Sequence, residues 1–326
     1  MRLIQFVLVL LLLSKASAFA QSFGWNAGFD GFLDNREYYS INNAQTFFGS
    51  RAWGEIGADL REHHSFRVGL NYLYEFGHDT DAHLPDVTMY YQYGSKKILF
   101  LIGSFQRRDI LEYPLAFLSD SLDYFQPNVQ GIYASYTGNN WHQGIFIDWI
   151  RRKTDDRHEQ FVFGLSGRLR HGVFFMENHI MMAHLSKNGI PDPDFHLRDN
   201  GGINVSLGLN FSRYCLFDTL VLKAGSLVSL DRIRELGSGW QAHVGFLGQV
   251  SARYRMLGID VLYYSGEGHK FLFGDPFYIL NNYGRLDLYV MPFMKDNINL
   301  KINFGTHLAN GQLDYSQRLL LSIAIK

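Results

Sequence analysis

The stretch INLKINFG, residues 298–305, alternates strictly between apolar and polar side chains. A period of two places all the large apolar residues on one face of an extended strand and the polar residues on the other. The same alternation recurs in 66–75, 161–170, 202–211 and 319–326. The sequence therefore predicts strands that each have one apolar face and one polar face.

Applied to the whole chain, this period predicts about sixteen strands, and most of them exceed the roughly 9–11 residues that cross a bilayer when tilted. A helical period appears only weakly, in 109–125. A secreted β-sandwich, propeller or solenoid would also alternate, but the predicted strands are longer than the roughly five or six residues usual there. The predicted strands are 23–33, 44–60, 65–76, 86–94, 97–106, 128–137, 141–151, 159–170, 173–185, 201–212, 217–228, 239–254, 257–266, 284–294, 297–308 and 314–326.

The predicted connections alternate between long and short along the chain. Outer-membrane barrels show this rhythm, because their external loops are long and their periplasmic turns are short. An even number of strands then places both chain ends on the periplasmic side. The longer connections are 34–43, 77–85, 107–127, 152–158, 186–200, 229–238, 267–283 and 309–313, and the shorter ones are 61–64, 95–96, 138–140, 171–172, 213–216, 255–256 and 295–296.

The first twenty residues have the features of a cleaved secretory signal: Arg2, an apolar run over 3–13 interrupted by Gln5, and small residues before position 21. The remainder, 21–326, is expected to form a single barrel domain. Beyond the signal, no apolar run approaches the roughly 18 residues of a membrane helix. The single cysteine excludes an intramolecular disulfide. A net charge of −1 without a basic tract does not predict a nucleic-acid partner.

The signal, the alternation and the loop rhythm together resemble the outer-membrane β-barrel superfamily of Gram-negative bacteria, specifically its porin-like members. The resemblance implies an all-β, antiparallel transmembrane barrel of about 16 strands, with 14 as the alternative, in the cell outer membrane. It also implies contact with outer-membrane lipid and folding by the outer-membrane assembly machinery, and it leaves a homo-oligomer open. Trp25 and Trp141 are expected near the periplasmic interface, and Trp149 and Trp240 near the outer one.

Strand number separates two functions. Barrels of about 16–18 strands leave an aqueous lumen, whereas about eight strands fill it with side chains. We therefore expect a porin-like channel for passive diffusion of small polar solutes, with no cofactor. The alternative is a barrel plugged by side chains or loops, which acts at the cell surface as an enzyme of the lipase or deacylase type, an adhesin or a scaffold.

The connection 107–127 is the longest, and it is rich in large apolar residues for an external loop. It is also the third long connection, and the third external loop of many porins folds inward and narrows the lumen, with acidic groups facing basic ones on the wall. The resemblance thus implies a constriction; packing over the rim or a neighbouring subunit is the alternative. The constriction candidates are Arg107, Arg108, Asp109, Glu112, Asp120 and Asp123, with Arg67 and Arg168 as their predicted wall partners.

Alternation also places charged side chains of both signs on the lumen wall. Buried charges need partners, so we expect some of these to form ion-pair networks and others to line a water path. A wall of one sign would have indicated ion selectivity, and the mixed signs do not. The lumen-wall candidates are Arg51, Glu55, Arg67, Glu75, Arg168, Arg170 and Lys301.

Catalytic and metal-binding patterns are weak. Acidic loops such as 78–83 and 192–199 contain calcium-type ligands, but acidic surface loops are common, so no metal site is assigned. His179 or His184 could join Ser186 in a hydrolase near the rim. No Gly-x-Ser-x-Gly nucleophile elbow occurs, however. We therefore expect that the protein is not an enzyme.

Overall fold

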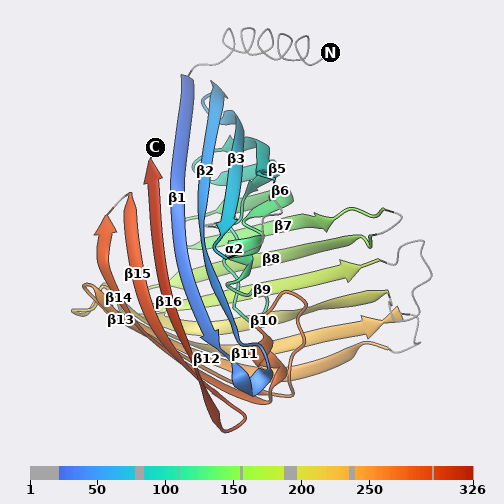
Figure 1. Cartoon of the computed structure of the whole chain (residues 1–326), viewed down its shortest axis with the longest axis vertical. Coiled ribbons are helices and arrows are strands. Elements are labelled where there is room, and N and C mark those ends of the chain that lie inside the picture. The colour runs from blue at the N-terminus through green and yellow to red at the C-terminus, as the bar shows by residue number, and fades with distance from the viewer. Residues whose placement is uncertain are drawn as a thin grey trace.

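The computed structural model describes residues 22–77, 84–108, 110–154, 157–186, 197–234, 239–295 and 297–325. Its strands form one closed antiparallel barrel in which each strand pairs with its neighbours in the chain and β1 pairs with β16 (Figure 1). The predicted sixteen-stranded barrel is confirmed. The predicted signal, residues 1–20, lies outside the described residues.

The strands are 9 to 17 residues long. No helix among the described residues is long and apolar enough to cross a membrane. The elements are β1 (Ser22–Glu37), η1 (Tyr39–Ile41), β2 (Gln45–Arg61), β3 (His64–Glu75), β4 (Asp86–Gly94), β5 (Ile98–Gln106), α2 (Leu122–Phe125), β6 (Asn128–Thr137), β7 (Trp141–Arg151), β8 (Gln160–His171), β9 (Phe174–Leu185), β10 (Arg198–Asn210), β11 (Thr219–Ile233), β12 (Gln241–Tyr254), β13 (Leu257–Gly266), η3 (Pro276–Ile279), β14 (Asn282–Lys295), β15 (Ile298–Ala309) and β16 (Gln312–Ile325).

The predicted strand ends differ from the observed ones mainly where charged residues continue a strand. β1 extends to Glu37 instead of residue 33, because Asp34 and Arg36 point inward and bind each other within the strand. The connection between β15 and β16 is only two residues, Asn310-Gly311. Both have positive φ angles, 51° and 74°, which is the conformation that an Asn-Gly hairpin turn adopts readily.

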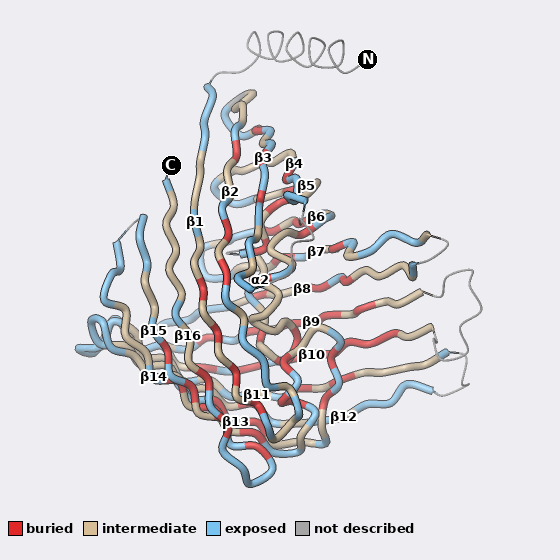
Figure 2. The backbone as a smooth tube through the Cα atoms, in the orientation of Figure 1, coloured by how far each residue is buried: buried red, intermediate tan, exposed pale blue. Residues whose placement is uncertain are grey.

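The two faces of the strands are those that the alternation predicts. In β15, Ile302 and Phe304 are 42% and 45% exposed, whereas Asn303 between them is 3% exposed. Red and pale blue accordingly alternate along many strands in Figure 2. Trp141 begins β7, and Trp149 lies near its other end. The outward positions form the apolar belt of a barrel in lipid.

The hydrophobic core lies inside the barrel. Two connections at the loop end, 107–127 and 267–281, turn inward and meet inward-facing side chains of the wall. Figure 1 shows α2, part of the first of these connections, inside the ring of strands. The buried cluster includes Phe117, Phe277 and Tyr283. The interior is therefore packed at this level by aromatic side chains from loops as well as strands.

Candidate functional site

The connection 107–127 packs inside the barrel against the second inward connection, 267–281. Phe117 is fully buried, and its ring centroid lies 4.6 Å from that of Phe271. Two backbone hydrogen bonds, of 2.7 and 2.8 Å, join the connections. The first connection thus has the inward position that the sequence predicts, but it lies beside a second inward loop that the sequence does not predict.

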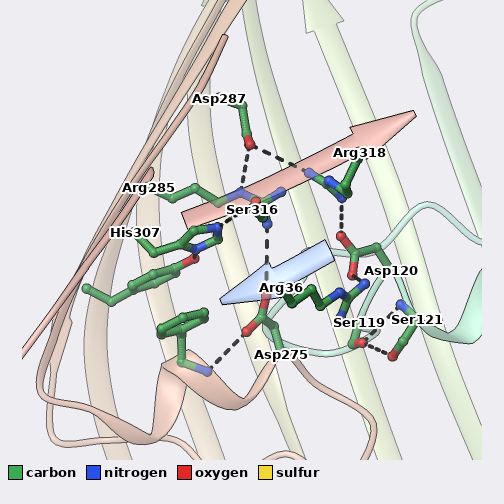
Figure 3. A network of polar contacts seen from close by, with 12 residues as sticks. Arg36, Ser119, Asp120, Ser121, Asp275, Arg285, Asp287, His307, Ser316 and Arg318 are labelled. Carbon is green, nitrogen blue, oxygen red and sulfur yellow. Dashed lines mark hydrogen bonds and ion pairs between the residues drawn. The ribbon is translucent and has the colours of Figure 1, made fainter. Parts of the chain in front are cut away.

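Asp120 anchors the first connection to the seam between the first and last strands. Its carboxylate lies 2.8 Å from Arg36 of β1 and 2.5 Å from Arg318 of β16 (Figure 3). Arg318 lies 3.6 Å from Asp287 as well. Burial by itself would raise the pKa of Asp120, but Arg318 and Arg36 hold that pKa below its usual range. Asp120 is therefore ionised and ties the loop to the wall.

Asp275 anchors the second connection to the same network (Figure 3). Its carboxylate accepts a 3.0 Å hydrogen bond from the backbone N–H of Phe277 at the start of η3. It lies 3.9 Å from Arg285, which also binds Asp287 at 2.6 Å. Burial and the negative charge of Asp120 raise the pKa of Asp275 to about 6, although Arg285 opposes the shift. One ionic network thus holds both inward connections.

The other predicted constriction residues do not gather around Asp120. Arg107 binds Asp148 at 2.5 Å, and Arg108 binds Asp30 at 2.7 Å. These pairs attach the first part of the connection to β7 and β1. Glu112 lines a periplasmic cavity and Asp123 is exposed, while Asp109 lies outside the described residues.

The predicted partners of the acidic loop residues are wrong. Arg67 binds Asp59 at 2.6 Å, and Arg168 binds Glu177, so neither arginine reaches Asp120. The alternation correctly places both arginines on the inner face. It carries no information about height along the barrel, and height decides which carboxylate an arginine meets.

The remaining lumen-wall candidates serve different parts of the interior. Arg51 donates a 2.7 Å hydrogen bond to the backbone oxygen of Asp123, so it supports the inward connection. Glu55 accepts from Thr88 and Tyr90, each at 3.2 Å. Of the remaining candidates, Glu75 lies at the loop end of β3. Arg170 and Lys301 line a cavity in the periplasmic half of the barrel.

A row of aromatic and polar residues crosses six strands on the outer face, at the loop end. Cross-strand pairing joins Trp149 of β7 to Phe161 of β8, Phe161 to His184 of β9, His184 to Asp199 of β10, and Asp199 to Arg232 of β11. The alternate residues of β9, such as His179 and Met181, are buried inside the barrel. Trp240, next to β12, ends the row, which we call the rim row. It consists of Trp149, Phe161, His184, Asp199, Arg232 and Trp240.

Asp199 is the centre of the polar part of the rim row. His184 Nδ1 lies 2.8 Å from one carboxylate oxygen. Arg232 and Arg234 each lie 2.7 Å from the other oxygen, and Arg234 also donates to the first at 3.0 Å. The side chain of Asp199 is 7% exposed and that of His184 is 21% exposed. Two arginines around one aspartate leave the cluster with net positive charge.

Aromatic rings hold this cluster on both sides. The Phe161 ring lies 5.0 Å from the His184 ring and stacks on Trp149 at 5.1 Å. The Arg232 guanidinium lies 4.4 Å from the Trp240 ring centroid. Trp149 and Trp240 are thus where the sequence predicts an interfacial belt. The polar cluster lies between these aromatic side chains.

The rim row has the elements of a general base. A histidine whose Nδ1 is held by a carboxylate has a fixed orientation, and its Nε2 is left to exchange protons with a substrate or water. The arginines offer charge to an anionic group or to a developing oxyanion. The sequence indicates His184 as a candidate but not its partner, because Asp199 lies in a segment that has the composition of an acidic loop.

Other histidines and loops do not form comparable sites. His179 faces inward and packs against Tyr113, 5.3 Å between ring centroids, so the barrel wall separates it from His184. The backbone N–H of Ser186 donates to Glu159. Residues 78–83 and 192–196 lie outside the described residues. Within the described part of the chain, no group of three or more His, Cys, Asp or Glu residues is arranged to hold a metal ion.

Solved structures with a similar fold are outer-membrane barrels. A loop L8 deletion mutant of OmpT, from Vibrio cholerae, superposes with a TM-score of 0.60 at 8% identity and covers 93% of this chain and 99% of its own. An anion-selective porin from Comamonas acidovorans has a TM-score of 0.57 at 10% identity, covering 93% and 99%. Salmonella typhi OmpF has a TM-score of 0.54 at 9% identity, covering 93% and 97%. These likenesses support the fold.

Comparison at the level of sequence families corrects one prediction. A family model described as lipid A 3'-O-deacylase-type matches residues 19–325, nearly the whole chain. The prediction that the protein is not an enzyme is therefore wrong, because this is an enzyme family. The absence of a Gly-x-Ser-x-Gly nucleophile elbow excludes only one type of hydrolase. No curated protein sequence matches the chain.

Proposed function

The chain belongs to the lipid A 3'-O-deacylase-type family, and we propose that it is an outer-membrane hydrolase that removes an ester-linked acyl chain from a phosphorylated glycolipid of the lipid A kind. The His184–Asp199 pair on the outer face of the barrel carries this proposal. A lipid substrate in the outer leaflet meets the outer wall of a barrel rather than its lumen. The pair lies on that wall, at the loop end and within the aromatic belt.

The reaction that this arrangement supports is hydrolysis by an activated water. Nε2 of His184 takes a proton from water while the water oxygen adds to the ester carbonyl carbon. Arg232 or Arg234 stabilises the charge that develops on the carbonyl oxygen or binds a phosphate of the substrate. The bond between the carbonyl carbon and the sugar oxygen then breaks, and His184 returns the proton to the leaving sugar alkoxide. The products are a fatty acid and a sugar hydroxyl.

The packed interior supports an outward site as well. Both inward connections fill the loop end of the lumen with buried aromatic side chains, among them Phe117 and Phe277, each 0% exposed. Together with the ionic network around Asp120, this packing favours the plugged barrel over a wide channel. A plugged barrel provides a rigid wall on which the rim row is held in register.

Fatty-acid release from lipid A in detergent micelles, measured by mass spectrometry, tests the proposal. Loss of a general base lowers rates by roughly 10²–10⁴-fold, so His184→Ala is expected to lose at least about a hundredfold, and Asp199→Asn to lose activity as well. His63→Ala, in an exposed periplasmic turn, is the matched control and should retain full activity. Wild-type release by folded His184→Ala would reject the assigned base, and no release by the intact protein would reject the hydrolase.

A passive channel is the second candidate, because sixteen strands enclose more space than side chains alone fill. The loops then set its conductance. Single-channel recording of the intact protein in a planar bilayer decides between a conducting and a closed lumen.

A further inference from the structure

The periplasmic half of the barrel contains a cavity beneath the inward connections. Its volume is about 530 Å³, and it shares five lining residues with a neighbouring cavity of about 900 Å³. Asn210 and Thr219, which flank the periplasmic connection between β10 and β11, line the smaller cavity. Asp120 and Leu115 of the inward connection line it too. We call the smaller cavity the vestibule; it is reached from the periplasmic side.

Charge is unevenly balanced around the vestibule. Its lining contains six lysine or arginine side chains and four carboxylates. The cations form two groups on separate arcs of the wall, divided by β12 and β13. One group is Arg168, Arg170 and Lys223, and the other is Arg285, Lys301 and Arg318.

Several of these cations lack a full set of partners in the described chain. Nη1 of Arg285 and Nε of Arg318 are buried without a hydrogen-bond acceptor. Lys301 lies 4.0 Å from the Tyr289 ring centroid. Across the described residues, neither Lys301 nor Arg170 forms an ion pair with a carboxylate within 4.0 Å. Leaving buried hydrogen-bond donors without acceptors costs free energy. An acceptor group that enters the vestibule satisfies them most simply.

Glu177 does not neutralise the first group. Its carboxylate lies between Arg168 and Lys223, 3.0 Å from the lysine nitrogen. One carboxylate between two cations leaves a positive charge, and Arg170 adds another. The first group thus keeps a net positive charge toward the vestibule. The second group is balanced in charge by Asp120, Asp260 and Asp287, but its members Arg285 and Arg318 line the same cavity and carry the buried donors without acceptors.

We infer that the vestibule binds a small multivalent anion, bearing phosphate or carboxylate groups, that enters from the periplasm and contacts both cation groups. A volume of about 530 Å³ is within the roughly 300–1,000 Å³ of sites that enclose small molecules. Net positive charge on walls of low dielectric constant concentrates anions and disfavours cations. The site lies on the opposite side of the barrel wall from the rim row, so it does not depend on the proposed hydrolysis.

Isothermal titration calorimetry of the purified full-length protein in a zwitterionic detergent tests the inference. Inorganic phosphate and the linear dicarboxylate adipate are the probes, and putrescine and sucrose are the cationic and neutral controls. Arg170→Gln and Lys301→Gln each remove one cation from a different group without breaking an ion pair between described residues. Each is expected to weaken anion binding about tenfold, equivalent to roughly 1.4 kcal/mol, and added salt is expected to weaken it further.

Lys270→Gln is the matched control, because it removes one exposed positive charge from the outer connection and should leave binding unchanged. Tighter binding of phosphate than adipate would identify a phosphate-bearing ligand, and the reverse a carboxylate-bearing one. No anion binding by the folded protein, or equal loss in Lys270→Gln, would overturn the inference. Sensitivity to only one of Arg170→Gln and Lys301→Gln would overturn the claim that the anion contacts both groups.

Discussion

Replacing Asp120 by asparagine should release the inward connection 107–127 from the barrel seam. The substitution keeps the shape of the side chain but removes the negative charge between Arg36 and Arg318, whose side chains are 6% and 12% exposed. Removing one partner from a buried ion pair costs roughly 3–5 kcal/mol. Arg36 keeps Asp34, and Arg318 keeps Asp287 at 3.6 Å, so we expect a loss of about 2–3 kcal/mol.

Guanidinium unfolding of the refolded barrel, followed by tryptophan fluorescence, measures this loss. Protease cleavage within 107–127 reports whether the connection opens before the barrel unfolds. Asp123→Asn is the control on the same connection; its side chain is exposed, so it should change stability by no more than about 0.5 kcal/mol. Equal effects of the two substitutions would refute the anchoring role of Asp120.

The pH dependence provides a second test. The folded pKa of Asp120 is below its ordinary value of 3.8, so its ionised form stabilises the folded state above that value. This stabilisation is lost as the pH falls from 3.8 toward the lower, folded pKa. The difference between the wild type and Asp120→Asn should therefore shrink progressively in this acidic range. A difference that stays constant there would show that the charge of Asp120 is not responsible.

Three further predictions concern the outer face of the barrel wall and the two inward connections. Leu300→Arg should cost ~2–4 kcal/mol in the same unfolding assay because it places charge in lipid, whereas Asn299→Ser, on the opposite face, should be mild; equal costs would contradict the face assignment. Asp275 has a folded pKa of about 6, against 3.8 ordinarily. Its protonated form therefore favours folding below pH 3.8, and this advantage is lost as the pH rises to 6. Asp275→Asn should thus increase the free energy of unfolding by up to about 3 kcal/mol at pH 8 and leave it unchanged at pH 3. Deleting 112–122 should increase single-channel conductance, and unchanged conductance in a folded barrel would reject a role in narrowing the lumen.

The fold could be predicted from the sequence because the bilayer imposes a period of two on every spanning strand. That period identified all sixteen strands, and loop length oriented them. The errors lie at strand ends. β11 continues to Ile233, five residues beyond the predicted end at Val228, since inward charges such as Asp231 find partners inside the barrel. Charged residues near the end of a strand therefore predict the start of a loop at positions where the strand in fact continues.

The contacts within the interior could not be predicted in this way. Alternation assigns Arg67, Arg168 and Arg318 to the same face, but only the register of sixteen strands tells which of them meets Asp120. The same limit applies to the rim row. His184 and Asp199 are far enough apart in sequence that only the pairing of β9 with β10 places them opposite each other.

Strand number alone does not decide the function, because it sets the width of the barrel and not what fills the lumen. Sixteen strands predict an open lumen, yet the connection 267–281 contributes Phe271, Phe277 and Tyr278 to the buried cluster, and the aromatic packing continues into Phe117 of the other inward connection. A loop that fills the lumen also rigidifies the wall from within, because Asp120 binds an arginine on each of the two strands of the seam. A rigid wall is what a site on the outer face requires, since His184, Asp199 and Arg232 belong to three strands and keep their geometry only if the register does. In the proposed function the two inward connections and the rim row are thus parts of one arrangement: the connections fill the loop end of the wide barrel, the rim row lies on its outer face, and the charged vestibule remains on the periplasmic side.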